Sequence, residues 1–267
     1  MSFLEHLEEL RWHIMRSVLA LAVLFGLAMY FSKEIFHYII FAPGRPDFVT
    51  FKWLCAAGEK LHIEGMCITS IPMKIQSRFL MGQFTMQMTS SAVIALIAGF
   101  PYIAWELWRF VKPGLYNNEK RGSRGAVFAS SSLFAIGVSF GYFVLCPMSI
   151  AFLANYSISD MISNEFDITS YVSTIAILVF GCGILFQLPV VIYFLTRIGI
   201  LTPVFMRYYR RHAAVIILII GALVTPTADP FTLALVSVPL YVLFEISIFV
   251  SSLEIKRQKK EEEKKQI

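Results

Sequence analysis

The chain has 267 residues, of which 57% are hydrophobic and 15% are charged, and it carries a formal net charge of +5. Its mean hydropathy of +0.67 is too high for a soluble domain of this length, so the composition excludes a soluble globular protein and predicts one that crosses a membrane several times. The basic balance does not indicate nucleic-acid binding, because no basic strand interleaved with aromatic residues and no groove-binding motif accompanies it.

Acidic residues open the chain directly before its first apolar run. On a helix, which advances about 100° per residue, the acidic residues share one arc and apolar residues occupy the opposite side. The acidic residues are Glu5, Glu8 and Glu9, and the apolar ones are Phe3, Leu7, Leu10 and Ile14. We interpret residues 3–12 as an amphipathic helix in the membrane interface, whose acidic face would take a cationic partner. The alternative is a capped helix start in which Glu9 faces His13.

A helix needs about 20 mostly apolar residues to cross a bilayer, and six apolar stretches are candidates for such spans. They cover residues 13–31, 86–108, 126–154, 171–195, 213–224 and 231–250. The sequence therefore predicts an all-α integral membrane protein with six transmembrane helices in a single membrane domain, residues 1–252. We expect the charged tail, residues 253–267, to be disordered. The fifth stretch is short and Pro239 interrupts the sixth, so we expect two short spans in a locally thinned bilayer.

Lysine and arginine gather in three regions that are expected to stay on the cytoplasmic side. These regions are residues 109–124, 197–211 and 256–265. The charged residues of the connection 155–170 are all acidic. Both termini are therefore predicted to be cytoplasmic, with a long exterior first loop, at about residues 32–85, that forms a small cap of its own.

Two further expectations concern this exterior loop. Residues 70–88 have helical spacing, so the second span is expected to project beyond the bilayer as a continuous helix. Cys55 and Cys67 lie in the loop, on the side where disulfides persist, and they could form one, whereas Cys146 and Cys182 lie within spans. No CxxC pair or Cys/His cluster indicates a metal site.

Polar side chains at membrane depth are functional candidates, because lipid cannot satisfy them. These side chains are Gln83 and Gln87 at the start of the second span, Gln187 in the fourth and Glu245 near the inner end of the sixth. The alternative for Gln187 is a hydrogen bond between helices of the bundle. The alternative for Glu245, which we favour, is a position near the inner headgroups or an ion pair with a basic neighbour such as Arg211 or Lys256.

Glycine pairs in the third and fourth spans indicate helix packing. Gly137 and Gly141 form a GxxxG motif, and Gly181 and Gly183 flank Cys182. The sequence contains no GxxxxGK[ST], HExxH or GxSxG motif. We therefore expect a protein that binds or conducts something, is not an enzyme and needs no cofactor.

Several motifs occur in a characteristic order. They are EHLEELR at residues 5–11, FVKPGLYNNEKR at 110–121, and TPTADP at 225–230 followed by PLYVLFE at 239–245. In order, spacing and side of the membrane they resemble the TatC family, the multispanning receptor subunit of the twin-arginine protein translocase. The resemblance extends over residues 2–252.

The resemblance implies a cytoplasmic site for signal peptides that carry paired arginines, with carboxylates at Glu9 and Glu119. Guanidinium groups bind carboxylates through two parallel hydrogen bonds, and this geometry discriminates arginine from lysine. The other residues expected at this site are Leu10, Arg11, Phe110, Pro113, Leu115 and Tyr116. The alternative for Glu119 is an ion pair within its own loop, with Lys120 or Arg121.

The resemblance also implies partners: single-span TatA-like and TatB-like subunits, further copies of the chain in a larger complex, and the lipid of the inner (plasma) membrane. The residues expected to bind partner subunits are Gln187, Thr225, Pro226, Asp229 and Glu245. Many family members carry glutamate where Gln187 stands, so a charged contact there becomes a neutral hydrogen bond in this chain.

Export of folded proteins would be driven by the proton-motive force, as the family implies. The rival class of function is a small-solute secondary transporter or channel. Such a protein needs a polar path through the bundle and often has two related halves, and the sequence shows no such repeat.

Overall fold

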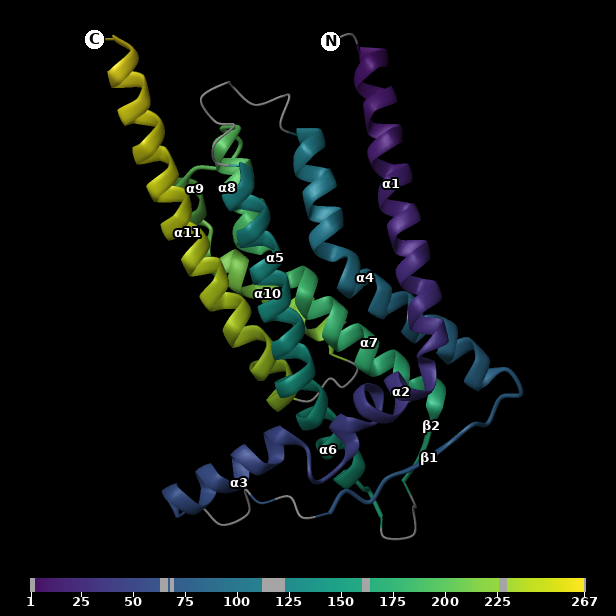
Figure 1. Ribbon diagram of the computed structural model, residues 1–267. Helices are drawn as coiled ribbons and strands as arrows, with labels where there is room; N and C mark the ends of the chain where they lie inside the picture. The colour runs from purple at the N-terminus through teal and green to yellow at the C-terminus, as the bar shows by residue number, and fades with distance from the viewer. Residues whose placement is uncertain are drawn as a thin grey trace.

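The computed structural model describes residues 3–62, 67, 70–111, 123–159, 164–225 and 230–266. Long helices run between two ends of the molecule, short elements gather at one end, and both termini lie at the other (Figure 1). Helices make up most of the described chain, and one sheet of two short strands is the exception in these ranges. The predicted all-α class is therefore confirmed.

Five helical stretches are long and apolar enough to cross a membrane. The first is α1 (Phe3–Tyr30), the second is α4 (Gly82–Val111), and the third joins α5 (Ser123–Phe140), η5 (Gly141–Leu145) and α6 (Cys146–Asn155). The fourth joins α7 (Ile168–Leu185) and α8 (Leu188–Arg197), and the fifth is α11 (Pro230–Gln266). These stretches correspond to five of the six predicted spans.

The remaining predicted span falls in α10 (Arg210–Val224), which follows the short helix α9 (Pro203–Tyr208). The 15 residues of α10 span about 22 Å at 1.5 Å per residue, less than the hydrocarbon core of about 30 Å. The count of six spans and their orientation therefore stay predictions.

The last span is longer than the sequence predicts. Its apolar part covers Thr232–Arg257, 26 residues, and Pro239 lies inside α11 without ending it. Val236 and Leu240, on either side of Pro239, are buried in the core of the bundle. This packing outweighs the loss of one backbone hydrogen bond at the proline.

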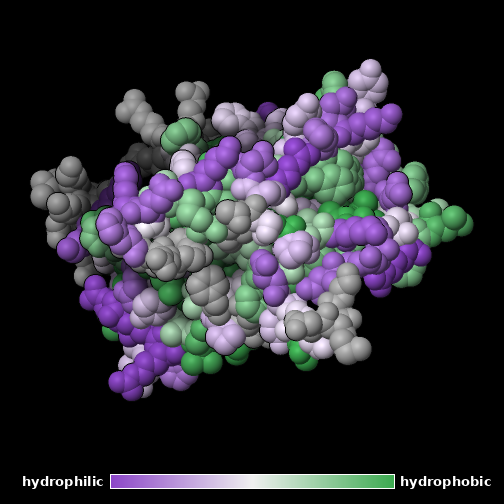
Figure 2. Space-filling view, turned by 90° about the horizontal axis from the view of Figure 1, so that it is seen from below, coloured by the Kyte–Doolittle hydropathy of each residue, from purple (hydrophilic) through white to green (hydrophobic). Residues whose placement is uncertain are grey.

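Short elements after α1 form a cap at the end of the molecule away from the termini (Figure 1). They are α2 (Ser32–Ile35), η1 (Phe36–Ile40), η2 (Ala42–Gly44) and α3 (Val49–Leu61). Gln87 on α4 donates a hydrogen bond of 2.8 Å to the Ser32 hydroxyl and so joins the cap to the second span. Seen from the cap side, hydrophilic residues are spread over much of the surface, with hydrophobic residues between them and at the rim (Figure 2).

The stretch before α4 is a strand where the sequence predicts a helix. β1 (Lys74–Gln76) pairs in parallel with β2 (Glu165–Asp167), with Ile75 opposite Phe166, and α4 begins only at Gly82. The prediction of a continuous helix over residues 70–88 is therefore wrong. Helical spacing describes one segment alone, whereas β1 gains its hydrogen bonds from a partner far along the chain.

Asp167 closes this sheet and starts the next span. Its carboxylate accepts hydrogen bonds from the backbone N–H of Thr169 at 2.8 Å and from that of Arg78 at 2.9 Å. The first bond caps the N-terminus of α7. The second fixes the chain between β1 and α4.

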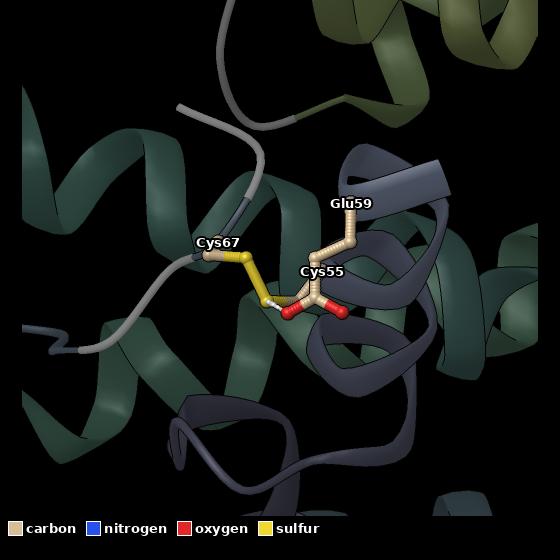
Figure 3. A group of neighbouring side chains, drawn as sticks. All are labelled: Cys55, Glu59 and Cys67. Carbon is tan, nitrogen blue, oxygen red and sulfur yellow. Dashed lines mark hydrogen bonds between the residues drawn. A yellow bond between two sulfur atoms is a disulfide. The ribbon is translucent and has the colours of Figure 1, made fainter. Parts of the chain in front are cut away.

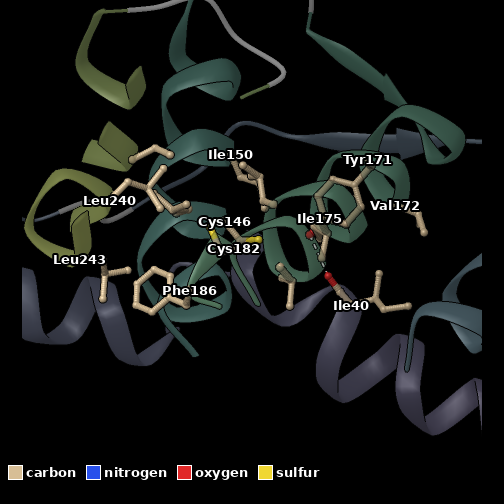
Figure 4. Packing of buried hydrophobic residues seen from close by; sticks show 14 of the residues in the cluster. Ile40, Cys146, Ile150, Tyr171, Val172, Ile175, Cys182, Phe186, Leu240 and Leu243 are labelled. Atoms are coloured by element: carbon tan, nitrogen blue, oxygen red, sulfur yellow. Dashed lines mark hydrogen bonds between the residues drawn. The ribbon is translucent and has the colours of Figure 1, made fainter. Parts of the chain in front are cut away.

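The main core joins the third and fourth spans with η1, α10 and α11. Leu145, Cys146, Leu178 and Cys182 are at most 1% exposed, and Figure 4 shows Cys146 and Cys182 at the centre of the cluster. Ile217 from α10 and Leu240 from α11 pack against the same cluster. The short helix α10 therefore belongs to the bundle.

The glycine pair of the third span permits close helix packing, as its motif predicts. A Cβ atom on Gly137 would lie 2.6 Å from the Cys182 carbonyl oxygen, and one on Gly141 would lie 2.8 Å from that of Leu178. Real Cβ atoms essentially never approach so closely. The third and fourth spans consequently touch backbone to backbone at these positions.

The predicted disordered tail is helical instead. α11 continues as one helix to Gln266. Ser251 and Glu254, both buried, face α8, where they contact Thr196 at 2.8 Å and Arg197 at 3.9 Å. These contacts hold the last turns of the apolar part, and lysine and glutamate, which dominate the residues after it, are themselves good helix formers.

Candidate functional site

The N-terminal part of α1 and the C-terminal end of α4 lie at the same end of the molecule (Figure 1), and the two helices pack against each other. Glu9 and Leu10 are half-buried on α1, Arg11 is exposed, and Phe110 is half-buried in the last turn of α4. These residues are the described part of the expected signal-peptide site. The other expected residues, Pro113, Leu115, Tyr116 and Glu119, lie outside the described residues.

Glu9 has no bond to His13, the residue that it faces in the alternative interpretation of the N-terminal helix. Within the described ranges, its carboxylate has neither a hydrogen bond nor an ion pair. His13, its expected neighbour at one helical turn, is bonded to a different acid. Glu9 is therefore available to a ligand on the described side of the site.

A buried pair that the sequence analysis missed joins α1 to α4. The imidazole Nδ1 of His13 is hydrogen-bonded to the Glu106 carboxylate, and the two residues are 6% and 4% exposed. The His13 ring also meets the Phe110 ring edge-on, with 6.3 Å between the ring centroids. The signal that finds Glu106 is a carboxylate inside the predicted second span, where lipid cannot satisfy it.

Gln187 lies at the break between α7 and α8, two residues before Pro189. Its side chain bonds twice to α5: the Ser130 hydroxyl donates to its amide oxygen at 2.7 Å, and its amide nitrogen donates to the Ser130 carbonyl oxygen at 3.1 Å. The hydrogen bond between helices, the alternative for Gln187, is thus present. It satisfies a polar group that would otherwise be exposed to lipid.

A cavity of about 350 Å³ opens beside this pair, between α4, α5 and α8. Its walls are apolar apart from the two bonded polar side chains. The lining includes Phe100, Ala104, Trp108, Ser130, Gln187 and Phe194. The arrangement offers an apolar surface with one hydrogen-bonding spot.

The remaining expected partner residues lie on other elements. Thr225, buried at the end of α10, donates its hydroxyl to the Gly221 carbonyl oxygen at 3.0 Å, and Pro226 and Asp229 lie outside the described residues. Glu245 pairs with Arg210 at 2.7 Å. The expected ion pair is therefore present, but its partner is Arg210 and not Arg211 or Lys256. No hydrogen bond connects Gln187, Thr225 and Glu245 in the part of the chain that the structure describes.

Cys55 and Cys67 form a disulfide in the cap. The Glu59 carboxylate lies beside it, 3.9 Å from the Cys55 sulfur (Figure 3). These side chains are the one group of three potential metal ligands found among the described residues. Because the two sulfur atoms are bonded to each other, neither is a thiolate that could hold a metal ion.

Comparison with known proteins agrees with these features. The family model described as Sec-independent protein translocase protein (TatC) matches residues 5–239. The chain is 38% identical to the Sec-independent protein translocase protein TatC of Blattabacterium sp. subsp. Periplaneta americana, over 94% of this chain and 95% of the relative. The protein of the same name from Aquifex aeolicus is 31% identical, over 97% of this chain and 98% of the relative.

Solved structures agree as well. A crystal structure of the twin arginine translocase receptor TatC has a TM-score of 0.68 at 29% identity and covers 93% of this chain and 98% of the other. A second crystal structure of this receptor, in DDM, has a TM-score of 0.73 at 28% identity and covers 92% of this chain and 99% of the other. Since sequence and fold agree over nearly the whole length, the chain belongs to the TatC family and is a membrane component of the twin-arginine protein translocase.

Proposed function

We propose that the chain is the receptor core of the translocase, which binds twin-arginine signal peptides at the cytoplasmic end of α1 and α4. The observation that carries this proposal is the half-buried Glu9 carboxylate, which has no partner within the described residues. It lies on a helix that packs against α4, and Glu119 follows the end of α4 by eight positions in the sequence. Two carboxylates at that place would suit two adjacent guanidinium groups.

The surroundings of Glu9 favour arginine over lysine as the ligand. A guanidinium group is planar and binds a carboxylate through two parallel hydrogen bonds, whereas an ammonium group is a strongly hydrated point charge. Glu9 is half-buried, which limits the hydration of its carboxylate. A ligand that replaces water with two directed hydrogen bonds would therefore be preferred.

The cavity beside Gln187 is the proposed place for a single-span partner subunit. Its apolar walls suit a transmembrane helix, and the Gln187 amide offers a hydrogen bond to a polar residue of that helix. Thr225, Pro226, Asp229 and Glu245 remain proposed partner residues. Of these, Glu245 has its own ion pair with Arg210, so a partner would compete for it.

The proposed setting is the inner (plasma) membrane with both termini in the cytoplasm. The proton-motive force would drive export of the folded cargo, and TatA-like and TatB-like subunits would join further copies of the chain in the active complex. Lysine and arginine near the ends of α4, α8 and α11 support this orientation.

Peptide binding to the purified protein tests the proposal. If Glu9 and Glu119 each bind one arginine, Glu9→Gln or Glu119→Gln should cost about 1.5 to 3 kcal/mol, the range for hydrogen bonds to charged groups, which is about tenfold to more than a hundredfold in affinity. The double variant should lose most of its preference for a twin-arginine over a twin-lysine peptide. Glu34→Gln removes an exposed acid of the cap, at the other end of the molecule, and is the control that should bind like wild type. A folded double variant that keeps the full preference would contradict the proposal.

Labelling of cysteines in sealed cells tests the orientation. Ile158 is 83% exposed in the connection between α6 and β2, so Ile158→Cys should react with a membrane-impermeant reagent added outside. Lys256→Cys, exposed on α11, should react only after the cells are opened. The reverse pattern would invert the topology and exclude the cytoplasmic site.

A further inference from the structure

The pair of His13 and Glu106 is costly for a membrane protein to keep. Both side chains are at least 92% buried between two helices whose outer surfaces are apolar. A buried carboxylate without a partner is strongly unfavourable, and a bonded one is tolerated. If helix packing were the one task of these residues, two apolar side chains in their place would make the fold more stable.

The pair is also the polar link between α1 and α4. Within the described side chains, no other hydrogen bond between side chains joins these two helices. Packing of Leu21 and Leu24 around Gly99 holds them together further along. Of the apolar window of α1, 11% is buried, and His13 is one of its buried residues.

The pair lies one helical turn from the proposed arginine site on both helices. Glu9 precedes His13 by four residues on α1, and Phe110 follows Glu106 by four residues on α4, so each couple shares a helix face. The contact of the His13 ring with the Phe110 ring shows that the two faces meet. A shift of either helix by one residue would rotate its face by about 100° and separate Glu9 from the end of α4.

We propose that His13 and Glu106 are positioning residues that hold the Glu9 carboxylate in the geometry required by a guanidinium group. This inference rests on the function proposed above. Two parallel hydrogen bonds require a carboxylate at a fixed place and angle, whereas a lysine ammonium tolerates displacement. Loss of the pair should therefore weaken binding of a twin-arginine peptide more than binding of a twin-lysine peptide.

The test compares affinities for the two peptides in purified full-length variants. His13→Ala and Glu106→Ala should each lower the ratio of arginine to lysine affinity by about tenfold, which corresponds to 1.4 kcal/mol. Glu106→Gln, which can still accept the bond from His13, should keep most of the ratio. The exchanged variant, His13→Glu with Glu106→His, restores the pair with its members reversed and should recover the ratio.

A matched control separates positioning from general loosening. Leu21→Ala weakens the packing between the same two helices without touching the pair, so it should lower thermal stability but leave the ratio unchanged. Spin labels on Trp12 of α1 and Leu107 of α4, both more than half exposed, report the helix arrangement. Their distance distribution should broaden in His13→Ala and narrow again in the exchanged variant.

Four results would contradict the positioning role of His13 and Glu106. An unchanged ratio in folded His13→Ala and Glu106→Ala would overturn the positioning role while leaving the receptor function intact. If Leu21→Ala lowered the ratio of arginine to lysine affinity as much as His13→Ala does, the pair would act only through ordinary helix packing. The same conclusion would follow if Glu106→Gln lowered the ratio as much as Glu106→Ala. A wild-type protein without preference for the twin-arginine peptide would overturn the receptor function itself, and this inference with it.

Discussion

The hydroxyl of Tyr171, in the first turns of α7, donates a hydrogen bond to the carbonyl oxygen of Ile40 at 3.1 Å, and both residues are buried. Ile40 ends the π-helix η1, so this bond satisfies a carbonyl group that the helix itself leaves free. It joins the cap to the fourth span (Figure 4).

Tyr171→Phe should therefore destabilise the protein, because it leaves the Ile40 carbonyl oxygen buried without a donor. We expect a cost of about 1 to 3 kcal/mol, measured as a lower thermal midpoint in detergent. Tyr142→Phe is the control, since its hydroxyl bonds to the carbonyl oxygen of Ile39 at 2.9 Å, and Ile39, unlike Ile40, is exposed. Equal effects of the two variants would show that burial of the Ile40 carbonyl group is unimportant.

Gln187→Leu should weaken crosslinking to a single-span partner subunit and leave peptide binding nearly intact. The leucine side chain cannot offer the proposed hydrogen bond at the cavity, whereas the arginine site lies on other helices. Ser130→Ala, the control, removes one of the two bonds that hold Gln187 but keeps its amide. Comparable loss of peptide binding and crosslinking in Gln187→Leu would mean that Gln187 only maintains the fold.

Gly141→Ala should be strongly destabilising. Its methyl group would meet the Leu178 carbonyl oxygen at 2.8 Å and the Val179 Cα atom at 2.9 Å, and backbone atoms cannot yield as a flexible side chain can. Overpacking of this kind costs about 1 to 3 kcal/mol. Gly26→Ala, where a Cβ atom meets nothing within 4 Å, should be neutral. The yield of monodisperse protein and its thermal midpoint measure both, and a stable Gly141→Ala protein would refute close backbone packing there.

Loss of the disulfide should release α3 without unfolding the bundle. Cys55 and Cys67 are separated by 12 positions, and closure of a loop of that size is worth about 3 kcal/mol by the chain-entropy estimate. We expect Cys55→Ser with Cys67→Ser to raise hydrogen exchange in residues 49–61. Exchange in α7 and α11 should not change, and a rise there would show that the cap stabilises the whole fold.

Asp167 should make stability depend on pH in the acid range. Hydrogen bonds from the Thr169 side chain, the Arg78 backbone and the Thr169 backbone hold the pKa of its carboxyl below the usual value. A pKa that is lower in the folded than in the unfolded state gives stabilisation that is present above the unfolded pKa and is lost as pH falls through the folded one. The contribution should therefore begin to decline near about pH 4 and be lost as the pH falls through the lower pKa of the folded state.

The measurement compares thermal midpoints of wild type and Asp167→Asn between neutral and acid pH. Wild type should be more stable at neutral pH, and the difference should shrink as the pH falls. Asp47→Asn removes a carboxylate of the cap without a side-chain hydrogen bond in the described chain and should show no such convergence. A constant difference between wild type and Asp167→Asn would exclude the linkage.

Sequence patterns predicted the features that depend on the residues of a single helix. Apolar runs located five stretches that the structure shows as long helices, and the GxxxG motif predicted the close contact at Gly141. Predictions from sequence patterns failed where the structure depends on contacts between segments that are far apart in the sequence. The helical spacing of residues 70–88 did not reveal that β1 pairs with β2, and the expectation that Glu9 faces His13 overlooked Glu106, 93 positions from His13.

Ion pairs show the same limit. The sequence predicted a basic partner for Glu245 but named Arg211 or Lys256, whereas the structure pairs it with Arg210. Neighbouring residues of a helix point about 100° apart, so the choice between Arg210 and Arg211 depends on the rotation of α10 against α11. That rotation follows from packing such as Gly221 against Ser237, which no local pattern reveals.

The pairing of β1 with β2 has a mechanical consequence. β2 leads directly into α7, and the chain after β1 is tied to Asp167 by the Arg78 backbone before it enters α4. The sheet thus links the second and fourth spans to each other at the cap end. If these spans move apart, the sheet keeps their cap ends together, so the widest displacement falls at their far ends, near Phe110 on α4 and Arg197 on α8.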